Sequence, residues 1–600
     1  MALSRRDLAI AYSYAGGLDE AQRYAREALE ARGQLPAQVL APAHKVLGDI
    51  AARRGESAVA INEYKAALAA ASERYRPVVL LSMTNAQIAA GDAATARATL
   101  DSSGAAHNPM LAALFLRING NLLLIEHKPQ AALEAFCSIV SKVGQGDPSY
   151  QNLWAYEGMG RAWLALGDQT RARAAWLQAI RYSEAVRARF RSDEFKTGLF
   201  ADTQNVFEEA IALVMQQGDY ELAWSLSEKS RSRALLDVVR NRVAGGVDTR
   251  QLNGAAPSLK EVRGALQPNE AIVEFHLLTR EMIVWVVRQD GLQGKTLPIT
   301  RRDMTEAVSD FRNAIVRGRP QALTYGAKLD ALLIKPLNLR PGERLIIVPN
   351  GALHYLPFQA LVNESGFLIQ RHPIAIEPSA SIAVQLLHRQ QRVAGDLVAF
   401  GNPRITPIYD LPGAEDEVLG IAPLFTKSKT FVEVQATRKA FIDNAPNSRI
   451  LHVATHTQAD TIDPLHSRML FAPLSQPADG PDVLLARDIF NLKFGSVALV
   501  TLSACDTGLG SIDRGDEIMG FTRAFFYAGV SAMMVSMWPV ADESTVILMR
   551  TFYGALASGQ EAIDAVRSAQ LAVLANHRFA HPFYWAPFDL IGGWRLTIAQ

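Results

Sequence analysis

Cysteine is scarce in this sequence: its 600 residues contain only two, Cys137 and Cys505. Two thiols exclude a disulfide framework and a four-thiolate zinc site, and such scarcity is typical of proteins in a reducing compartment. We therefore expect a cytoplasmic location, and each cysteine needs an explanation of its own.

Long apolar runs and an excess of one charge are also absent. No segment reaches the roughly 18 apolar residues of a membrane-spanning helix, and the first ten residues, MALSRRDLAI, lack the apolar core of a signal peptide. Sixty-one basic and 60 acidic residues give a formal net charge of +1. With no global field to attract nucleic acid or an anionic membrane, we expect neither as a partner.

The composition instead suits a large globular protein. Hydrophobic residues make up 49% of the chain and charged residues 20%, which excludes a disordered or fibrous protein. A single core usually stops growing at roughly 250 to 300 residues. A chain of 600 residues is therefore expected to form at least two domains.

A helical repeat recurs through residues 1–240. Each unit has a small residue, an alanine five positions later and a third anchor after four more: Gly16/Ala21/Ala25, Gly55/Ala60/Tyr64, Gly91/Ala96/Leu100, His127/Ala132/Phe136, Gly167/Ala172/Trp176 and Gly218/Ala223/Ser227. The units begin 39, 36, 36, 40 and 51 residues apart. The pattern resembles tetratricopeptide repeats, in which a glycine allows the tight turn between two helices. Stacked units of this kind bind a protein segment, although they could also form only a spacer.

Three further features of this region have simple interpretations. Cys137 follows Phe136 on the same predicted helix with no histidine or acid signature around it, so we interpret it as a core residue. The basic cluster that includes Arg231 could bind nucleic acid, but a solvated helix face is favoured. Residues 241–258 are rich in Gly, Asn and Pro, which predicts a linker.

From residue 259 short apolar runs alternate with helical segments, which predicts an α/β domain with a mainly parallel sheet. We expect strands at 271–277, 282–287, 345–348, 397–400, 450–454, 497–503 and 532–538. We expect helices at 302–316, 415–424, 438–443, 517–528 and 543–557. Such sheets place their chemistry in the loops at the carboxyl ends of the strands.

Two of these strand ends carry candidate catalytic residues. One strand ends at His456 and another at Cys505, 49 residues later, about the spacing of a histidine upstream of a caspase-type cysteine. A free thiol is mostly protonated at neutral pH, and a nearby imidazole favours the thiolate or moves the proton. Cys505 would attack a peptide carbonyl, and His456 would protonate the departing amine. The backbone N–H groups of Cys505 and Thr457 could stabilise the oxyanion.

Other interpretations of these residues stay open. Cys505 alone could be a small buried residue, and His452, in the middle of its strand, is more typical of a hydrogen-bonded core histidine than of a base. Two histidines and one cysteine lack a fourth ligand or paired spacing, and HExxH is absent, so we expect no metal and no cofactor.

Residues 259–600 resemble a CHAT domain, the caspase-like module found after tetratricopeptide repeats in bacterial proteins and related to separases. Besides the two strand ends, the resemblance rests on 348–358 (VPNGALHYLPF), 411–418 (LPGAEDEV), 515–521 (GDEIMGF) and 536–540 (SMWPV). It implies a caspase-like half without catalytic residues at 259–392 and an active half at 396–600. It also implies that His456 and Cys505 are the dyad of an endopeptidase. Thr457 departs from the usual His-Gly pair, which puts the backbone conformation of that oxyanion donor in question.

The resemblance implies a function as well. Related separases carry an acid a few residues after a tryptophan, and Asp542 follows Trp538 by four, so Asp542 would favour Arg or Lys before the cut. Alternatively, Asp542 caps the following helix. We expect a protease of bacterial defence or programmed cell death whose repeats bind a substrate or regulatory protein. Gly508–Gly515 could be a gate that a partner displaces. The alternative is a catalytically silent adaptor that only binds proteins.

Overall fold

A computed structural model describes most of the chain. The described residues are 1–15, 17–31, 35–144, 149–187, 193–231, 257–387, 392–458, 460, 464–474, 480–503, 520–540 and 542–599. The chain divides into two compact units, Met1–Asp219 and Tyr220–Gln600. Most of the predicted linker, 241–258, lies outside the described residues.

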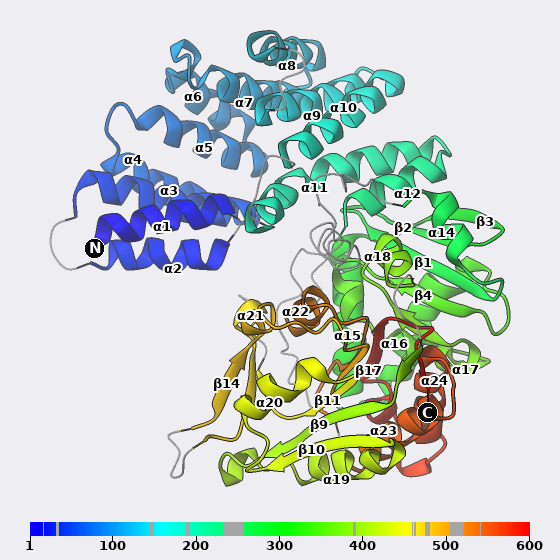
Figure 1. The fold of residues 1–600 in the computed structure, drawn as a ribbon. Helices are drawn as coiled ribbons and strands as arrows, with labels where there is room; N and C mark the ends of the chain where they lie inside the picture. The colour runs from blue at the N-terminus through cyan, green and yellow to red at the C-terminus, as the bar shows by residue number, and fades with distance from the viewer. Residues whose placement is uncertain are drawn as a thin grey trace. The chain divides into compact units, whose positions relative to one another are not determined.

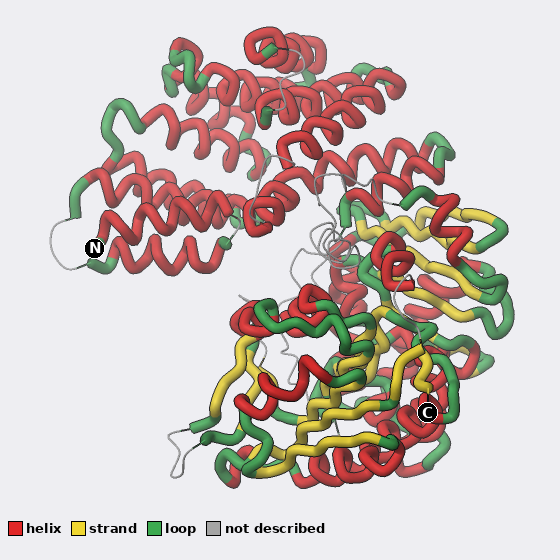
Figure 2. Tube along the Cα trace, in the orientation of Figure 1, coloured by secondary structure: helices red, strands yellow, loops and turns green. Residues whose placement is uncertain are grey.

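The first unit consists of helices that pack as consecutive antiparallel pairs (Figures 1 and 2). They are α1 (Ala2–Ala15), α2 (Leu18–Leu29), α3 (Ala37–Arg53), α4 (Ser57–Ala70), α5 (Arg76–Ala89), α6 (Ala93–Ser102), α7 (Ala112–Ile125), α8 (Pro129–Val143), α9 (Tyr150–Ala165), α10 (Gln169–Arg187) and α11 (Asp193–Gln216). The predicted helical repeats are confirmed.

The glycine anchors occupy the turns between paired helices. Gly55, Gly91, Gly167 and Gly218 all have φ between 77° and 84°, a left-handed conformation that glycine adopts without a Cβ clash. His127 adopts the same conformation with φ 58°, so the weaker fourth unit turns in the same way despite its side chain. Gly16 lies outside the described residues.

The third anchor of three units packs against a glycine of the preceding helix, 16 residues earlier. A Cβ on Gly48 would lie 2.5 Å from the Tyr64 ring, and one on Gly160 would lie 2.3 Å from Trp176. Gly120 faces Phe136 in the same way. The small residue allows the two helix backbones to approach around a fully buried aromatic ring.

Two interpretations of single residues were wrong. Cys137 is exposed on α8 rather than part of the core, because its neighbour Phe136 takes the buried position. Arg231 is buried rather than on a solvated face. Helix α12 (Tyr220–Lys229), which leads to Arg231, falls in the second compact unit.

The second unit is built around an eleven-stranded, mainly parallel sheet (Figure 2). The strand order is β10 (Lys427–Glu433), β9 (Asp396–Pro403), β11 (Ile450–Ala454), β15 (Leu499–Leu502), β16 (Ala532–Ser536), β17 (Phe588–Gly592), β7 (Ile374–Ile376), β4 (Arg344–Val348), β1 (Glu270–Leu277), β2 (Met282–Arg288) and β3 (Gly291–Leu297). A small side sheet contains β12 (Thr457–Gln458), β13 (Arg468–Phe471) and β14 (Asp482–Leu485). The predicted α/β domain with a mainly parallel sheet is confirmed, and all seven predicted strands occur.

The sheet reverses direction at its middle. Strand β16 is antiparallel to β17, whereas β17 runs parallel to β7, and β7, β4 and β1 are parallel to one another. The carboxyl ends of β11 and β15 therefore point to the opposite end of the sheet from those of β1 and β4. Strands β11 and β15 are third and fourth from one edge of the sheet, and β1 and β4 are third and fourth from the other.

Helices cover both faces of the half that carries β9, β11 and β15 (Figure 1). On one face Phe400, Leu451, Val453 and Leu502 join a core with α20 (Arg438–Asn444), α21 (Ala486–Ile489) and α22 (Gly520–Ala528). On the other face lie α19 (Pro412–Ile421) and α23 (Asp542–Ala557), with α24 (Ala562–Leu574) beside α23. Because side chains alternate along a strand, every second residue of β11 and β15 faces α19 and α23.

Further helices accompany the half that carries β1 and β4. They are α14 (Leu259–Ala265), α15 (Arg301–Val316), α16 (Gln321–Leu329), α17 (Leu368–Arg371), α18 (Ala380–Leu387) and, near the C-terminus, α25 (Pro582–Trp585). Among the described residues, no helix is long and apolar enough to cross a membrane.

Candidate active site

The two predicted catalytic strands lie side by side. Strands β11 and β15 pair in parallel with Val453 opposite Leu502, and the Ser503 N–H donates to the Val453 carbonyl at 2.9 Å. His456 follows β11 by two residues, and Cys505 follows Ser503 by two. Cys505 and the predicted gate Gly508–Gly515 lie outside the described residues. The structure therefore brings together the ends of the two strands that lead to His456 and Cys505.

The His456 ring is half-buried and oriented by Tyr409. Its Nε2 lies 3.2 Å from the Tyr409 carbonyl oxygen, and the two rings meet edge-on at 5.4 Å between centroids. Because a carbonyl oxygen only accepts, this contact places the hydrogen on Nε2. In that tautomer Nδ1 is the basic nitrogen, the atom that can take a proton.

Thr457, the predicted oxyanion donor, begins the short strand β12 opposite Met469 of β13. The Leu470 N–H donates to the His456 carbonyl at 2.9 Å, so Thr457 and Met469 form the non-hydrogen-bonded type of antiparallel pair. The Thr457 N–H consequently points away from β13.

A buried polar network lies beneath this edge of the sheet, on the face covered by α19 and α23. His452 is fully buried, with Nε2 3.0 Å from the Glu417 carboxylate and Nδ1 3.1 Å from the Tyr553 hydroxyl. The Tyr553 hydroxyl donates to Thr501 at 2.7 Å, and burial raises the pKa of Tyr553 far above its usual value. The Ser503 hydroxyl donates to the same Glu417 carboxylate at 2.9 Å. His452 is thus a hydrogen-bonded core histidine, as its mid-strand position predicted.

Asp542 is the first residue of α23 and is exposed, and its side chain packs against the start of α19. A Cβ added to Gly413 would lie 2.2 Å from the Asp542 Cγ. Gly413, part of the LPGAEDEV segment, therefore makes room for this carboxylate. Asp542 therefore lies beside the start of α19, the helix that carries Glu417.

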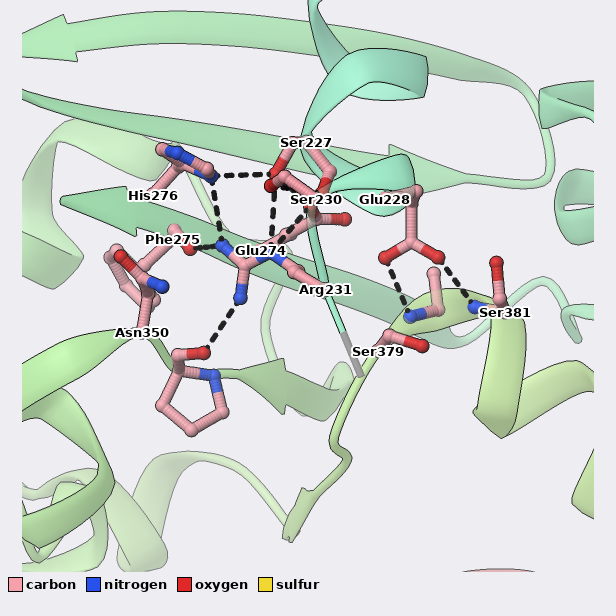
Figure 3. A network of polar contacts seen from close by, with 12 residues as sticks. Ser227, Glu228, Ser230, Arg231, Glu274, Phe275, His276, Asn350, Ser379 and Ser381 are labelled. Carbon is pink, nitrogen blue, oxygen red and sulfur yellow. Dashed lines mark hydrogen bonds and ion pairs between the residues drawn. The ribbon is translucent and has the colours of Figure 1, made fainter. Parts of the chain in front are cut away.

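The corresponding edge of the other half, where β1 and β4 end, is filled by the end of α12 (Figure 3). The Arg231 guanidinium donates to the Pro349 carbonyl at 2.8 Å and to the Phe275 carbonyl, and its Nε lies 3.3 Å from Glu274. The Ser227 hydroxyl donates to Glu274 at 2.6 Å and contacts His276 Nδ1 at 2.9 Å. Desolvation and the nearby Glu228 carboxylate raise the pKa of Glu274.

Glu228 connects the same helix to α18 (Figure 3). Its carboxylate accepts hydrogen bonds from the N–H groups of Ala380 and Ser381, at 3.0 and 2.7 Å. These groups belong to the first turn of α18, where backbone donors lack partners within the helix and a negative charge is favourable. A side chain distant in sequence therefore caps α18 and ties α12 to it.

Sequence reasoning missed Tyr409, Glu417 and Arg231. Tyr409 acts through its backbone carbonyl, a group that every residue has, so the residue type does not reveal this role. Glu417 follows two other acids, Glu415 and Asp416, in the LPGAEDEV segment, and only the tertiary fold selects it for burial. The described residues contain no group of three or more His, Cys, Asp or Glu side chains placed to hold a metal ion.

Part of the chain matches a known domain family, and part of it matches curated repeat proteins. Residues 323–593 match the CHAT domain family. Tetratricopeptide repeat protein 28 of Homo sapiens is 26% identical over 297 residues, which cover 42% of this chain and 12% of that protein. The Mus musculus protein is 25% identical over the same length. The match thus spans about an eighth of these relatives.

The fold resembles that of a chain in a solved protein complex. A chain of the separase–securin complex of Saccharomyces cerevisiae is similar with a TM-score of 0.50 and 12% identity, covering 99% of this chain and 53% of that one. At this identity the likeness concerns the fold alone. The protein therefore combines tetratricopeptide-like helical repeats with an α/β unit that matches the CHAT domain family and has a separase-like fold.

Proposed function

We propose that this protein is a cysteine endopeptidase with Cys505 as nucleophile and His456 as proton-transfer group. The observation that carries the proposal is the placement of His456, whose Nε2 lies 3.2 Å from the Tyr409 carbonyl beside the strand that leads to Cys505. A histidine held in one tautomer at the end of a parallel strand suits proton transfer with a thiol from the next strand.

The reaction would proceed in two covalent stages. In the first, the Cys505 thiol gives its proton to His456 Nδ1, and the sulfur forms a bond to the carbonyl carbon of the substrate peptide. The carbonyl oxygen takes the displaced electron pair and accepts hydrogen bonds from the backbone N–H groups of Cys505 and Thr457. The carbon–nitrogen bond then breaks, and the His456 imidazolium protonates the leaving amine.

In the second stage, water attacks the thioester carbon while His456 accepts a proton from the water. The carbon–sulfur bond breaks, His456 returns its proton to the Cys505 sulfur, and the new carboxylic acid leaves and loses its proton to solvent. The products are one peptide with a new C-terminus, one with a new N-terminus, and the original enzyme.

We further propose that the first unit recognises a protein substrate or regulator, because stacked pairs of helices of this kind bind protein segments. Limited cleavage controlled in this way suits a role in bacterial defence or programmed cell death. A catalytic thiol also needs reducing conditions, which is why we place the protein in the cytoplasm.

A peptide library made from a digested proteome tests the proposal without knowledge of the natural substrate. The wild type and Cys137→Ala should generate the same new peptide ends, detected by mass spectrometry, whereas Cys505→Ala should generate none. His456→Ala should slow cleavage by about 10²- to 10⁴-fold. Cys137→Ala is a matched control because it removes the other thiol, which is exposed on the first unit.

Identical peptide ends from the wild type and Cys505→Ala would overturn the protease proposal. Peptide or protein binding without any cleavage by the wild type would instead support the catalytically silent adaptor.

A further inference from the structure

Strand β9 ends in a bulge at Asn402. Its neighbour β10 pairs Val432 with Gly401 and then Glu433 with Pro403, so Asn402 has no partner in the ladder. Asn402 also has φ 43°, in the left-handed region, and is buried. A bulge of this kind turns a side chain out of the regular alternation of the strand.

The Asn402 amide binds the segment after Tyr409. Its Oδ1 accepts a hydrogen bond from the Leu411 N–H at 2.7 Å. Its Nδ2 donates to the carboxylates of Asp410 at 3.0 Å and Glu415 at 3.3 Å. Only this orientation of the amide fits, because the backbone N–H needs an acceptor and the two carboxylates need a donor.

These contacts fix the residues that follow Tyr409 directly. Tyr409 ends a short 3₁₀ turn in which its N–H donates to the Thr406 carbonyl at 2.9 Å, so its backbone is held on both sides. The Tyr409 carbonyl is the group that accepts from His456 Nε2. The bulge lies close by, because Gly401, immediately before Asn402, is opposite Ala454 at the end of β11.

We infer that Asn402 is a positioning residue for the proposed reaction: its amide holds the Tyr409 carbonyl where that carbonyl fixes the tautomer and orientation of His456. This inference rests on the proposed function. Asn402 touches neither substrate nor the reacting atoms, so it acts only through Tyr409 and His456.

The residue type follows from the two requirements of this position. Asparagine tolerates a left-handed φ better than most residues, and its amide offers one acceptor and one donor group. In Asn402→Asp the shape and the acceptor remain, but a third carboxylate replaces the donor and faces Asp410 and Glu415. The double variant Asn402→Asp/Asp410→Asn exchanges the two side chains. An amide donor again faces a carboxylate, and the total charge equals that of the wild type.

Alkylation by iodoacetamide measures the reactivity of the Cys505 thiolate without a peptide substrate. The thiolate displaces iodide, and the adduct is quantified by mass spectrometry. The rate is measured from pH 5 to 9 in the full chain for both cysteines. Cys137 is the internal reference. It is exposed to the reagent, and because desolvation and Glu134 raise the pKa of its thiol, it forms little reactive thiolate at acidic pH. In the wild type, Cys505 should react about tenfold or more faster than Cys137 at acidic pH.

Asn402→Asp should move the pH of half-maximal Cys505 labelling upward by about one unit, and the double variant should return it toward the wild-type value. Asn447→Asp, which adds the same charge at an exposed site, should leave it unchanged. An unchanged Cys505 profile in Asn402→Asp, or no recovery in the double variant, would overturn the inference while the protease proposal stands. If wild-type Cys505 reacts no faster than Cys137, the proposed function itself falls, and this inference with it.

Discussion

The Ser503 hydroxyl donates a 2.9 Å hydrogen bond to the Glu417 carboxylate. This bond ties the end of β15, two residues before Cys505, to α19. The other oxygen of the same carboxylate lies 3.0 Å from His452 on β11. One buried acid thus holds together the ends of the two strands from which the proposed dyad projects.

Glu417→Ala should therefore destabilise this edge of the sheet. It leaves the Ser503 hydroxyl buried without its acceptor and removes the carboxylate that lies 3.0 Å from His452 Nε2, which should lower the unfolding free energy by about 3 kcal/mol. Hydrogen exchange of the β11 and β15 amides in increasing urea measures the loss. Asp416→Ala, an exposed change on the same helix, should stay within about 0.5 kcal/mol; equal effects of both variants would contradict the role assigned to Glu417.

Arg231→Met should loosen the opposite edge of the sheet. The substitution fills similar volume but removes the donors to the Pro349 and Phe275 carbonyls and leaves Glu274 without its cation. Breaking a buried ion pair from one side costs about 3 to 5 kcal/mol. Faster hydrogen exchange in β1 and β4 is the expected readout, and Lys229→Met, two residues earlier, is the control for loss of a positive charge. Normal protection of β1 in Arg231→Met would show that the network adds nothing to stability.

Gly160→Ala tests the glycine–aromatic packing of the repeats. The new methyl group would lie 2.3 Å from Trp176, so the ring or the helix backbone must move. Overpacking of this kind costs about 1 to 3 kcal/mol and should lower the thermal midpoint of the helical unit, followed by circular dichroism and hydrogen exchange in α9 and α10. Gly264→Ala in α14 meets open space and should leave its helix as stable or slightly more stable.

Glu377 should make stability depend on pH. It is fully buried at the end of β7 with no hydrogen-bond partner in the described part of the chain, and desolvation raises its pKa well above 4.5. The folded protein then keeps a proton that the unfolded chain loses above about pH 4.5, so the contribution of Glu377 to stability falls as pH rises toward the folded-state pKa.

Glu377→Gln removes this dependence because an amide does not titrate. The unfolding free energy of Glu377→Gln minus that of the wild type should grow with pH above 4.5, by at most about 1.4 kcal/mol per unit, as measured by urea unfolding at several pH values. A difference that stays constant from pH 5 to 9 would mean that Glu377 is not protonated in the folded state.

Asp542→Asn tests the substrate preference. If the exposed carboxylate beside Gly413 binds the residue before the cut, the variant should lose most of any preference for Arg or Lys in the peptide-library profile. Glu543→Gln, which breaks a surface ion pair of 2.8 Å with Arg578, should keep that preference. An unchanged profile in Asp542→Asn would mean that Asp542 does not bind substrate and only stabilises the start of α23.

Local patterns in the sequence were enough to predict the architecture. The glycine anchors, such as Gly55 and Gly167, predict the helical turns because few other residues adopt a left-handed φ at low cost. The apolar runs around Leu451 and Val500 predict the parallel strands because both faces of such a sheet are covered. His456 and Cys505 were candidates for the same reason, since parallel strands bring their carboxyl ends to one edge of the sheet.

The sequence by itself determined the two kinds of domain, the strands and the pair of residues on which the proposed chemistry depends. Only the tertiary structure decided which polar groups are buried and paired. It exposed Cys137, buried Arg231 against two backbone carbonyls, and brought the Tyr409 carbonyl to His456. Such contacts join residues far apart in the chain, and their strength comes from burial, which no local pattern of residues encodes.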